Sequence, residues 1–482
     1  MAQMKRRSSS IFKRSMTNMA SVEETELSTT LAGQGGARRR KSIAANFPTD
    51  ADLEQNNTEN NTGNNDSNLA ELALEHLEDG SLFCLEHEPR AIPYFEQKEL
   101  NLGRFLGEGE FGTVYEVFGL GNDTGNGAQE SNHGPLPEAP ASNGQVEPNQ
   151  GGQSNSMESF GDFDEQNDDE EELKRFMMMH PNRGGKPRYA AKHIKKRLEG
   201  HMREDAIIDL ACEAAFLSRI LHPNIVRLRG TVGTPGSPKF TLILDRLDQT
   251  LTNKIADWKD EFKRRTKNFF RKDKLGLASL FHERLLAAYD IARALRHLHS
   301  LNLLFRDLKP DNCGFDFRGD ARLFDFGLCK ELKEQDLVQK DPDAYRASGL
   351  TGSRRYMSPE VAKCLPYGFA ADVYSFGILF WQIFALKTPF DEFTASKHTA
   401  RVVLGGKRPP SIQNMLGPRS KTLHKLMESC WAEDPSKRPS FEGVCSAICA
   451  ELEMLDNGAG PLDRSNMLLA ESRHSRHFLL VQ

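Results

Sequence analysis

The chain has 482 residues, a formal net charge of −5 and a hydrophobic share of 38%. This hydrophobic share is below the usual value for a globular protein, so we expect disordered segments beside the folded part. The small net charge is unremarkable for the whole chain, and we expect no nucleic-acid partner.

Cysteines and apolar runs exclude two further classes of protein. The eight cysteines form no Cys-x-x-Cys pair, and we expect reduced thiols rather than a zinc site or disulfides. The longest apolar run, residues 376–386, is too short to cross about 30 Å of hydrocarbon as a helix. It is typical of a buried core helix, and we expect no membrane span.

The first part of the chain has the composition of an unfolded tail. Residues 1–48 are rich in Arg, Lys, Ser and Thr, residues 51–67 are rich in Asn and acids, and neither stretch has a periodic apolar pattern. We therefore expect a disordered extension over residues 1–98. The basic N-terminus leaves nuclear or organellar targeting open, and the cytoplasm is the default expectation.

A glycine-rich segment follows this extension. Residues 106–114 read Leu-Gly-Glu-Gly-Glu-Phe-Gly-Thr-Val, in which three glycines let the backbone approach phosphate oxygens. A dinucleotide-binding fold would need a helix directly after the glycines. The β-rich segment 113–117 follows instead, which favours a hairpin over a phosphate group.

Residues 119–187 interrupt the expected sheet with a stretch rich in Gly, Asn, Pro, Gln and acids. A long excursion is tolerated inside a compact unit because the cost of closing a flexible loop grows only logarithmically with its length. We expect a disordered insert, and we expect that replacing residues 122–184 with a short Gly/Ser linker leaves basal activity within about a fewfold.

A lysine and a glutamate come next, in elements of different type. Lys192 lies in the strand-like run 189–194, and Glu213 lies in the helical pattern 207–217. A surface lysine is the plain alternative, but a lone glutamate in an apolar helix is costly to bury. We therefore expect the two side chains to form an ion pair.

A basic stretch with interleaved aromatic residues spans residues 258–274. Three interpretations stay open: a docking surface for an acidic partner, a clasp for the acidic residues 168–172, and a solvated helix extension. The solvated helix is favoured, because charge runs usually form the exposed face of a helix.

The most informative segments are Phe-Arg-Asp-Leu-Lys-Pro-Asp-Asn at residues 305–312 and Asp-Phe-Gly at residues 325–327. A single Asp-Phe-Gly triplet means little in a chain of this length. The polar run is typical of a loop, and a short strand pair after it would bring Asn312 and Asp325 to one metal ion. Asp307 would then face an acceptor hydroxyl.

Together with the segments 358–360, 372–377 and 430–439, these motifs resemble the ordered signature of eukaryotic protein kinases. The resemblance implies an α+β, two-lobed protein kinase fold with a small β-rich N-lobe and a larger, mainly helical C-lobe. The expected boundaries are 99–247 for the N-lobe, 248–455 for the C-lobe and 456–482 for a C-terminal tail. Glu360 is expected to pair with Arg438, and Asp372 to accept hydrogen bonds from the catalytic-loop backbone.

The resemblance also implies the roles of the site residues and the use of ATP and Mg²⁺. Asp307 orients the substrate hydroxyl, Lys309 neutralises the transferred phosphoryl group, and Lys192 with Glu213 holds the ATP phosphates. The implied metal ligands are Asn312 and Asp325. The implied nucleotide-binding residues are Leu106, Gly107, Gly109, Gly112, Val114, Ala190, Lys192, Leu244, Asp245 and Leu247.

Within the family, residues 307–312 resemble serine/threonine kinases, and residues 372–376 resemble their tyrosine-kinase-like group. The implied partner is a protein with Ser or Thr acceptors. A pseudokinase scaffold is the main alternative and a tyrosine kinase a distant one, but the intact set of charged site residues favours an enzyme. Phe305 replaces the usual His, whose packing role another ring fills, and Gly314 replaces a large residue beneath adenine, so altered nucleotide affinity is expected.

Regulation by phosphorylation is expected between Asp325 and Glu360. In similar kinases, the arginine at the position of Arg306 pairs with a phosphate, and an upstream kinase acting on Ser348 or Thr351 would supply it. The plain alternative is a constitutive pair between Arg306 and an acid such as Asp341 or Asp343.

Overall fold

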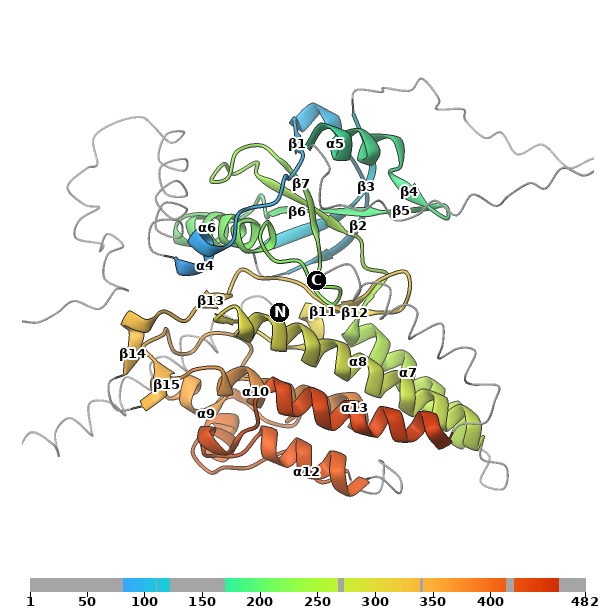
Figure 1. Ribbon diagram of the computed structural model, residues 1–482, viewed down its shortest axis with the longest axis vertical. Helices are drawn as coiled ribbons and strands as arrows, with labels where there is room; N and C mark the ends of the chain where they lie inside the picture. Colours follow the sequence, from blue (N-terminus) through green and yellow to red (C-terminus); the bar gives the residue numbers. More distant parts are fainter. Residues whose placement is uncertain are drawn as a thin grey trace, which may run out of the picture.

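The computed structural model describes residues 81–109, 111–121, 170–267, 273–338, 341–412 and 420–458. These residues form two lobes, and the sheet-containing N-lobe lies above the helical C-lobe in Figure 1. The expected two-lobed α+β fold is therefore confirmed.

The N-lobe is built on a six-stranded sheet with the order β1-β7-β8-β6-β3-β2. Its neighbouring strands are antiparallel, except that β1 and β7 run parallel. The strands are β1 (Tyr94–Phe95), β2 (Leu100–Glu108), β3 (Gly112–Leu120), β6 (Tyr189–Ile194), β7 (Leu228–Val232) and β8 (Thr241–Asp245).

Helices cover both faces of this sheet because its side chains alternate between them. Leu242 and Leu244 of β8 belong to the main core, which also contains the buried side of α6 (His201–Leu217). Ile243, between them, belongs to a separate cluster closed by Met177 of α5 (Glu170–Met179). The short helix α4 (Leu82–Glu86) and the hairpin of β4 (Asn182–Arg183) and β5 (Lys186–Pro187) complete this lobe.

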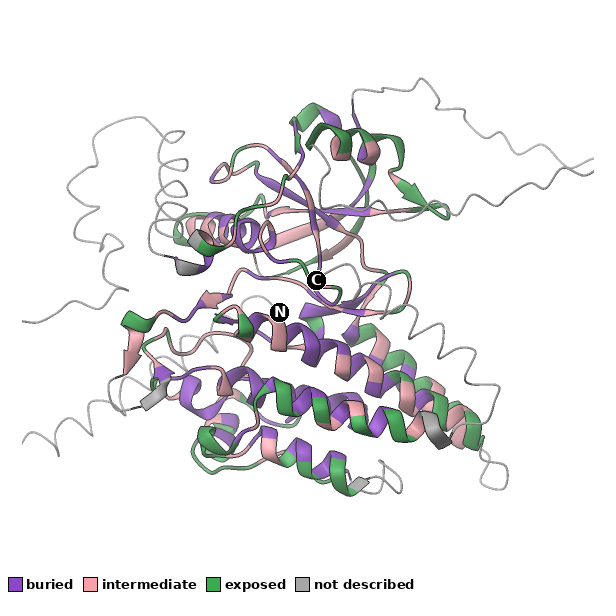
Figure 2. Ribbon diagram, viewed as in Figure 1, coloured by how far each residue is buried: buried purple, intermediate pink, exposed green. Residues whose placement is uncertain are grey.

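The C-lobe consists mainly of helices. They are α7 (Leu251–Thr266), α8 (Lys274–Ser300), α9 (Pro359–Ala362), α10 (Ala370–Ala385), α11 (Ala395–His398), α12 (Ser420–Cys430) and α13 (Phe441–Gly458). Helix α10 is buried on all sides from Ala371 onward, and its sequence is accordingly almost continuously apolar. The expected core helix is therefore confirmed. Figure 2 shows the buried residues gathered on α8 and α10 and exposed residues on α12 and α13.

Short strand pairs in the C-lobe hold the segments that carry the polar motifs. Strand β11 (Cys313–Phe315) pairs with β9 (Gln249–Thr250) and β12 (Ala321–Leu323), and β10 (Leu303–Leu304) pairs with β13 (Lys330–Glu331). Further along, β14 (Leu337–Val338) pairs with β15 (Asp341–Tyr345).

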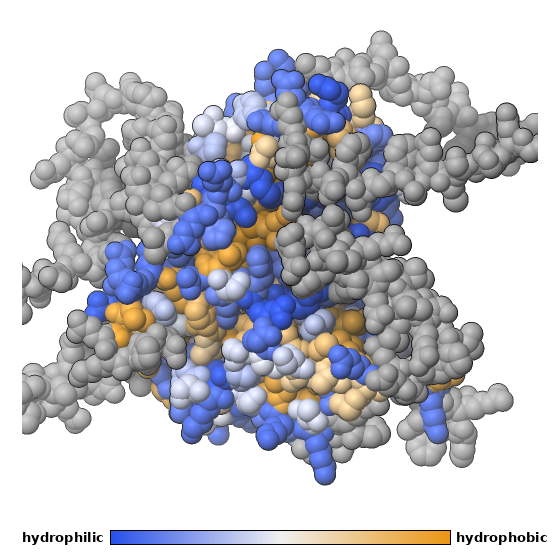
Figure 3. All heavy atoms as spheres, viewed as in Figure 1, coloured by the Kyte–Doolittle hydropathy of each residue, from blue (hydrophilic) through white to orange (hydrophobic). Residues whose placement is uncertain are grey.

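On the face shown in Figure 3, hydrophilic residues cover much of both lobes, and hydrophobic residues show mainly in the middle of the face.

Two of the expected disordered segments are wrong in part, because each contains ordered elements within the described residues. The expected disordered extension 1–98 contains α4 and β1, because Phe83 and Phe95 are buried in the core. The expected disordered insert 119–187 contains α5 and the β4–β5 hairpin, and Met177 is fully buried. Residues 1–80 and 122–169 lie outside the described residues.

The basic segment 258–274 is mostly a continuation of two helices. Trp258 is buried, and acids on α7 pair with several of its bases: Lys263 contacts Asp260, and Arg265 contacts Glu261. These pairs support a helix extension in which some of the basic side chains are neutralised within α7. Residues 268–272 lie outside the described residues.

Candidate active site

The glycine-rich turn joins β2 to β3. Gly109 donates its N–H to the carbonyl of Gly112 (2.9 Å), which closes the turn between these two glycines. A side chain added at Gly107 would meet no atom within 4 Å in the described part of the chain, and one added at Gly109 would meet only the Gly112 carbonyl, at 3.9 Å. Protein packing therefore does not require glycine at these two positions, and an open backbone is what a phosphate-binding turn needs.

Lys192 lies on β6, opposite Val114 of β3, and is one strand away from this turn. Its Nζ donates to Oε2 of Glu213 at 2.5 Å and to Oδ1 of Asp325 at 2.6 Å. Burial alone lowers the pKa of Lys192, but the two carboxylates outweigh this effect and the net shift is upward. The same ammonium lowers the pKa of Asp325 despite its burial. The expected Lys192–Glu213 pair is therefore present.

Helix α6 delivers Glu213 to this position. Most of its last three turns are buried, and the exposed fraction of Glu213 itself is only 1%. A carboxylate this deep is stable as an anion only beside a cation. The contact with Lys192 satisfies that requirement, and it fixes α6 relative to the sheet.

Asp307 lies at the centre of a polar loop before η3 (Pro310–Asn312). Its Oδ1 accepts a hydrogen bond from Ser353 N (2.8 Å), and its Oδ2 accepts from Lys309 Nζ (2.6 Å) and Asn312 Nδ2 (2.9 Å). The loop geometry is set from below by Asp372, which accepts from the backbone N–H groups of Phe305 (2.8 Å) and Arg306 (2.9 Å). The expected role of Asp372 is therefore confirmed.

The two candidate metal ligands come from neighbouring positions on one hairpin. Cys313 of β11 is paired with Leu323 of β12, and Phe324 N donates to the Asn312 carbonyl at 3.0 Å. Asn312 Nδ2 donates both to the Asp307 carbonyl (3.0 Å) and to its carboxylate. The amide oxygen Oδ1 of Asn312 is thus turned away from Asp307, and an oxygen ligand suits a hard cation such as Mg²⁺.

Phe305 fills the place of the usual histidine by ring packing. Its ring contacts the ring of Phe326 edge to face, with centroids 5.2 Å apart, and both side chains are buried. This contact joins the Asp307 loop to the Asp325-Phe326-Gly327 segment. The expected packing role of Phe305 is confirmed.

The connection between the lobes follows β8. Asp245 N donates to Arg227 O and Arg246 N donates to Arg188 O, but the N–H of Leu247 makes no hydrogen bond to any residue that the structure describes. Leu244, the residue before Asp245, is buried. Ala190 is its partner on the neighbouring strand β6 and is also buried. An unpaired backbone donor beside apolar side chains is the arrangement that an adenine edge requires.

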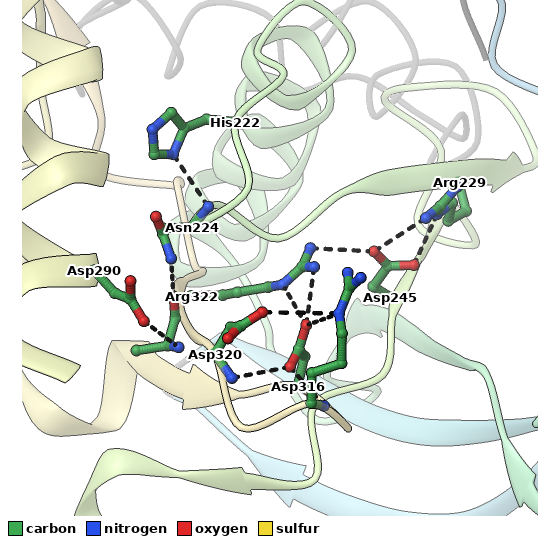
Figure 4. Close-up of polar contacts among 10 residues, drawn as sticks. His222, Asn224, Arg229, Asp245, Asp290, Asp316, Asp320 and Arg322 are labelled. Atoms are coloured by element: carbon green, nitrogen blue, oxygen red, sulfur yellow. Dashed lines mark hydrogen bonds and ion pairs between the residues drawn. The ribbon is translucent and has the colours of Figure 1, made fainter. Parts of the chain in front are cut away.

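The Asp245 side chain is occupied elsewhere (Figure 4). Its carboxylate accepts from Arg229 (2.7 Å to Oδ1) and from Arg322 (3.5 Å to Oδ2), and Arg322 also contacts Asp316 at 3.0 Å. Burial raises the pKa of Asp245, and the two guanidinium groups more than reverse this effect, so the net shift is downward. Its side chain is therefore unavailable for the predicted contact with a nucleotide, and it ties β7 and β8 to β12.

Gly314 of β11 lies against Leu247. A side chain added at Gly314 would place its Cβ 2.7 Å from Leu247 Cδ1 and 3.2 Å from the Gln249 carbonyl. Leu247 therefore occupies the space that a larger residue at position 314 would take. The sequence showed that glycine replaces a large residue at position 314, but it did not show that Leu247 fills the space. Leu247 lies in the connection between β8 and β9, far from Gly314 in the sequence.

The segment after Asp325 contains the candidate phosphorylation site. Arg306 Nη1 donates to Ser348 Oγ at 2.8 Å, and Arg306 Nε donates to the Leu328 carbonyl at 2.6 Å. Thr351 Oγ1 lies 3.2 Å from Ser348 Oγ. The side chains of Asp341 and Asp343, the alternative partners of Arg306, lie outside the described residues.

A buried ion pair anchors the end of this segment. Arg438 Nη1 and Nη2 donate to the two carboxylate oxygens of Glu360 at 2.6 and 3.0 Å, and Arg438 Nε donates to the Ala432 carbonyl. This two-point contact is the strongest geometry for such a pair. The expected Glu360–Arg438 pair is confirmed.

Comparisons with known proteins agree with this geometry. The model of the protein kinase domain family matches residues 178–448, more than half of the chain. The chain therefore belongs to the protein kinase domain family.

Several curated kinases resemble the chain over this region. The chain is 30% identical to the Arabidopsis thaliana serine/threonine/tyrosine-protein kinase HT1 over 238 residues, which are 49% of this chain and 53% of that protein. It is 27% identical to the Arabidopsis thaliana serine/threonine-protein kinase CTR1 over 278 residues (57% and 30%), and 32% identical to the Dictyostelium discoideum dual specificity protein kinase shkA over 248 residues (51% and 42%). The matches span about half or less of the length of these relatives.

None of the helices in the described ranges is long and apolar enough to cross a membrane.

Proposed function

We propose that this chain is an ATP-dependent protein serine/threonine kinase, which transfers the γ-phosphoryl group of ATP to a protein hydroxyl. The observation that carries the proposal is the double contact of Lys192 with Glu213 and Asp325, at 2.5 and 2.6 Å. It joins a strand and a helix of the N-lobe to the C-lobe, in the arrangement that phosphoryl transfer requires.

The residues divide the work between positioning and charge. Lys192, held by Glu213, would contact the α- and β-phosphates, and the open turn at Gly107 and Gly109 would cover the phosphates with backbone N–H groups. The adenine edge would meet the N–H of Leu247. Asp307, fixed by Ser353 N, would accept the proton of the acceptor hydroxyl.

A divalent cation fits the hairpin that carries Asn312 and Asp325, and we propose Mg²⁺ with these two residues as its protein ligands. The donor set of one carboxylate and one amide oxygen suits a hard cation that keeps other ligands from water and phosphate. When bound, Mg²⁺ would neutralise charge that develops on the phosphates. Lys309, 2.6 Å from Asp307, would place a further positive charge beside the transferred group.

Radiolabelled ATP and a peptide array with Ser, Thr and Tyr acceptors test this function. We expect label on Ser and Thr peptides. Nucleotide binding without transfer to any peptide or to the chain itself would instead support a pseudokinase scaffold. Label confined to Tyr peptides would contradict the acceptor class. The predicted cytoplasmic location stays a prediction, which imaging of a tagged chain tests.

Regulation by phosphorylation at Ser348 is part of the proposal. Ser348 Oγ already accepts from Arg306, so a phosphate there would form a charge-assisted bond with the same guanidinium. Thr351, next to it, is the second candidate. We expect phosphatase treatment and Ser348→Ala to lower activity, and unchanged activity after both, with Thr351→Ala also fully active, would eliminate the switch.

A further inference from the structure

Residues 81–95, which we term the N-terminal strap, pass the C-terminal end of α6 and enter the sheet as β1. Ser81 Oγ accepts from Cys84 N (3.0 Å) and starts α4, and β1 ends the strap by pairing with β7. In Figure 1, α4 lies directly beneath α6. Sequence reasoning assigned this segment to a disordered tail, although the apolar residues after Ser81 were a signal of a capped helix.

The strap holds the C-terminal end of α6 through three hydrogen bonds. Arg90 donates from Nη2 to Leu217 O and from its backbone N to Ser218 O, both at 2.9 Å. Arg219, in turn, donates from Nε to His87 O at 3.0 Å. The last carbonyls of a helix have no partner within the helix, so a guanidinium is a favourable cap at this end.

Phe83 connects α6 to the segment that follows Asp325. Its ring lies against the ring of Phe216 with centroids 5.9 Å apart, and its exposed fraction is 2%. Its backbone N donates to Oε1 of Glu331 at 2.9 Å in a buried contact. Glu331 belongs to β13, which pairs with β10 immediately before the Asp307 loop. One residue thus contacts α6 and the strand pair that supports the catalytic loop.

These contacts lie close to the catalytic glutamate. Glu213 is four residues, about one helical turn, before Leu217, whose carbonyl accepts from Arg90. A rotation of α6 that withdrew Glu213 from Lys192 would also break the contacts at Phe216, Leu217 and Ser218. The strap therefore opposes that rotation.

We propose that Phe83 is a positioning residue for phosphoryl transfer, which acts by locking α6 to β13 and so keeps Glu213 on Lys192. The inference rests on the proposed kinase function, because it treats the Lys192–Glu213 pair as part of that chemistry. The N-terminal strap would then belong, together with α6, to the elements that hold the active site in place.

A double-mutant cycle tests this inference in the full chain. We expect Phe83→Ala to lower peptide kcat by about tenfold, a typical size for coupling between sites, at a temperature well below unfolding. In the Glu213→Gln background, where the pair is already weakened, Phe83→Ala should have almost no further effect. Phe83→Leu, which keeps an apolar side chain, should restore most of the activity.

Met177→Ala is the control for general destabilisation, because Met177 is also fully buried in the N-lobe but belongs to the cluster on the other side of the sheet. It should lower kcat equally with and without Glu213→Gln. Equal losses from Phe83→Ala in both backgrounds would overturn the proposal. If Phe83→Ala does not fold, Arg90→Ala, at a half-buried position, replaces it in the same cycle with the same expected non-additivity.

Hydrogen exchange separates failure of this inference from failure of the proposed function. We expect faster amide exchange across α6 in Phe83→Ala than in Met177→Ala, whether or not the chain transfers phosphate. An inactive wild-type chain with this exchange pattern would contradict the function but not the locking of α6. Unchanged exchange in α6 would contradict the locking itself.

Discussion

Truncation of Met177 tests whether α5 is part of the folded N-lobe. Met177 is fully buried against a cluster that includes Phe95 and Val117, and α5 is further held by Lys174, whose Nζ lies 3.2 Å from Glu99 and 4.8 Å from the ring centroid of Phe95. Met177→Ala removes the buried end of the side chain and leaves a cavity. We expect the free energy of unfolding to fall by about 2–5 kcal/mol.

Met179→Ala is a matched control, because Met179 lies on the same helix with an exposed fraction of 68%. We expect its effect to stay within about 0.5 kcal/mol. Urea unfolding should be followed by far-ultraviolet circular dichroism, since all three tryptophans lie in the C-lobe and tryptophan fluorescence alone would miss the N-lobe. Equal unfolding free energies for the two variants would refute the assignment of α5 to the core.

The burial of Met177 also contradicts the expected tolerance to deletion. Deleting residues 122–184 removes α5 and Met177 together, so we now expect this deletion to destabilise the N-lobe. Deleting residues 122–169 keeps α5.

Two further predictions concern the C-lobe. Glu360→Gln leaves the fully buried Arg438 without its anion and should lower the free energy of unfolding by about 3–5 kcal/mol. Glu442→Gln, at an exposed ion pair, should lower it by about 1 kcal/mol or less. Similar urea midpoints for the two variants would contradict this difference. Burial and two nearby guanidinium groups lower the pKa of His398 to about 4. The His398 imidazole therefore binds a proton more tightly in the unfolded chain than in the folded one, and the free energy of unfolding falls as the pH drops below about 6.5. His398→Leu should remove about 3 kcal/mol of this fall between pH 7 and pH 4. An unchanged pH dependence of stability in this variant would contradict the prediction.

The residues that carry chemistry could be predicted from the sequence because their motifs fix both type and spacing. Lys192 and Glu213 were expected to pair, and the structure brings both of them, and Asp325 as well, within hydrogen-bond distance of one another through Lys192 Nζ. Glu360 and Arg438, 78 positions apart, were paired by the same resemblance. The motif order carried this information, since no local pattern links such distant residues.

The surrounding supports could not be predicted in the same way. Phe83 and Glu331 are 248 positions apart, and neither belongs to a recognisable motif. Met177 follows an acidic, polar stretch, and a single buried methionine gives no periodic signal. Short helices that depend on tertiary packing have weak intrinsic patterns, so composition alone assigned them to unfolded segments.

Phosphate transfer by the Asp325→Ala variant is the most direct test of the central claim. The wild type, Asp325→Ala and the exposed control Asp391→Ala should be compared with ATP, Mg²⁺ and a Ser/Thr peptide, after circular dichroism has shown the same fold for all three. We predict that Asp325→Ala lowers turnover by at least about a hundredfold while Asp391→Ala keeps wild-type turnover. Wild-type turnover by a folded Asp325→Ala protein would contradict the assignment of this site to phosphoryl transfer.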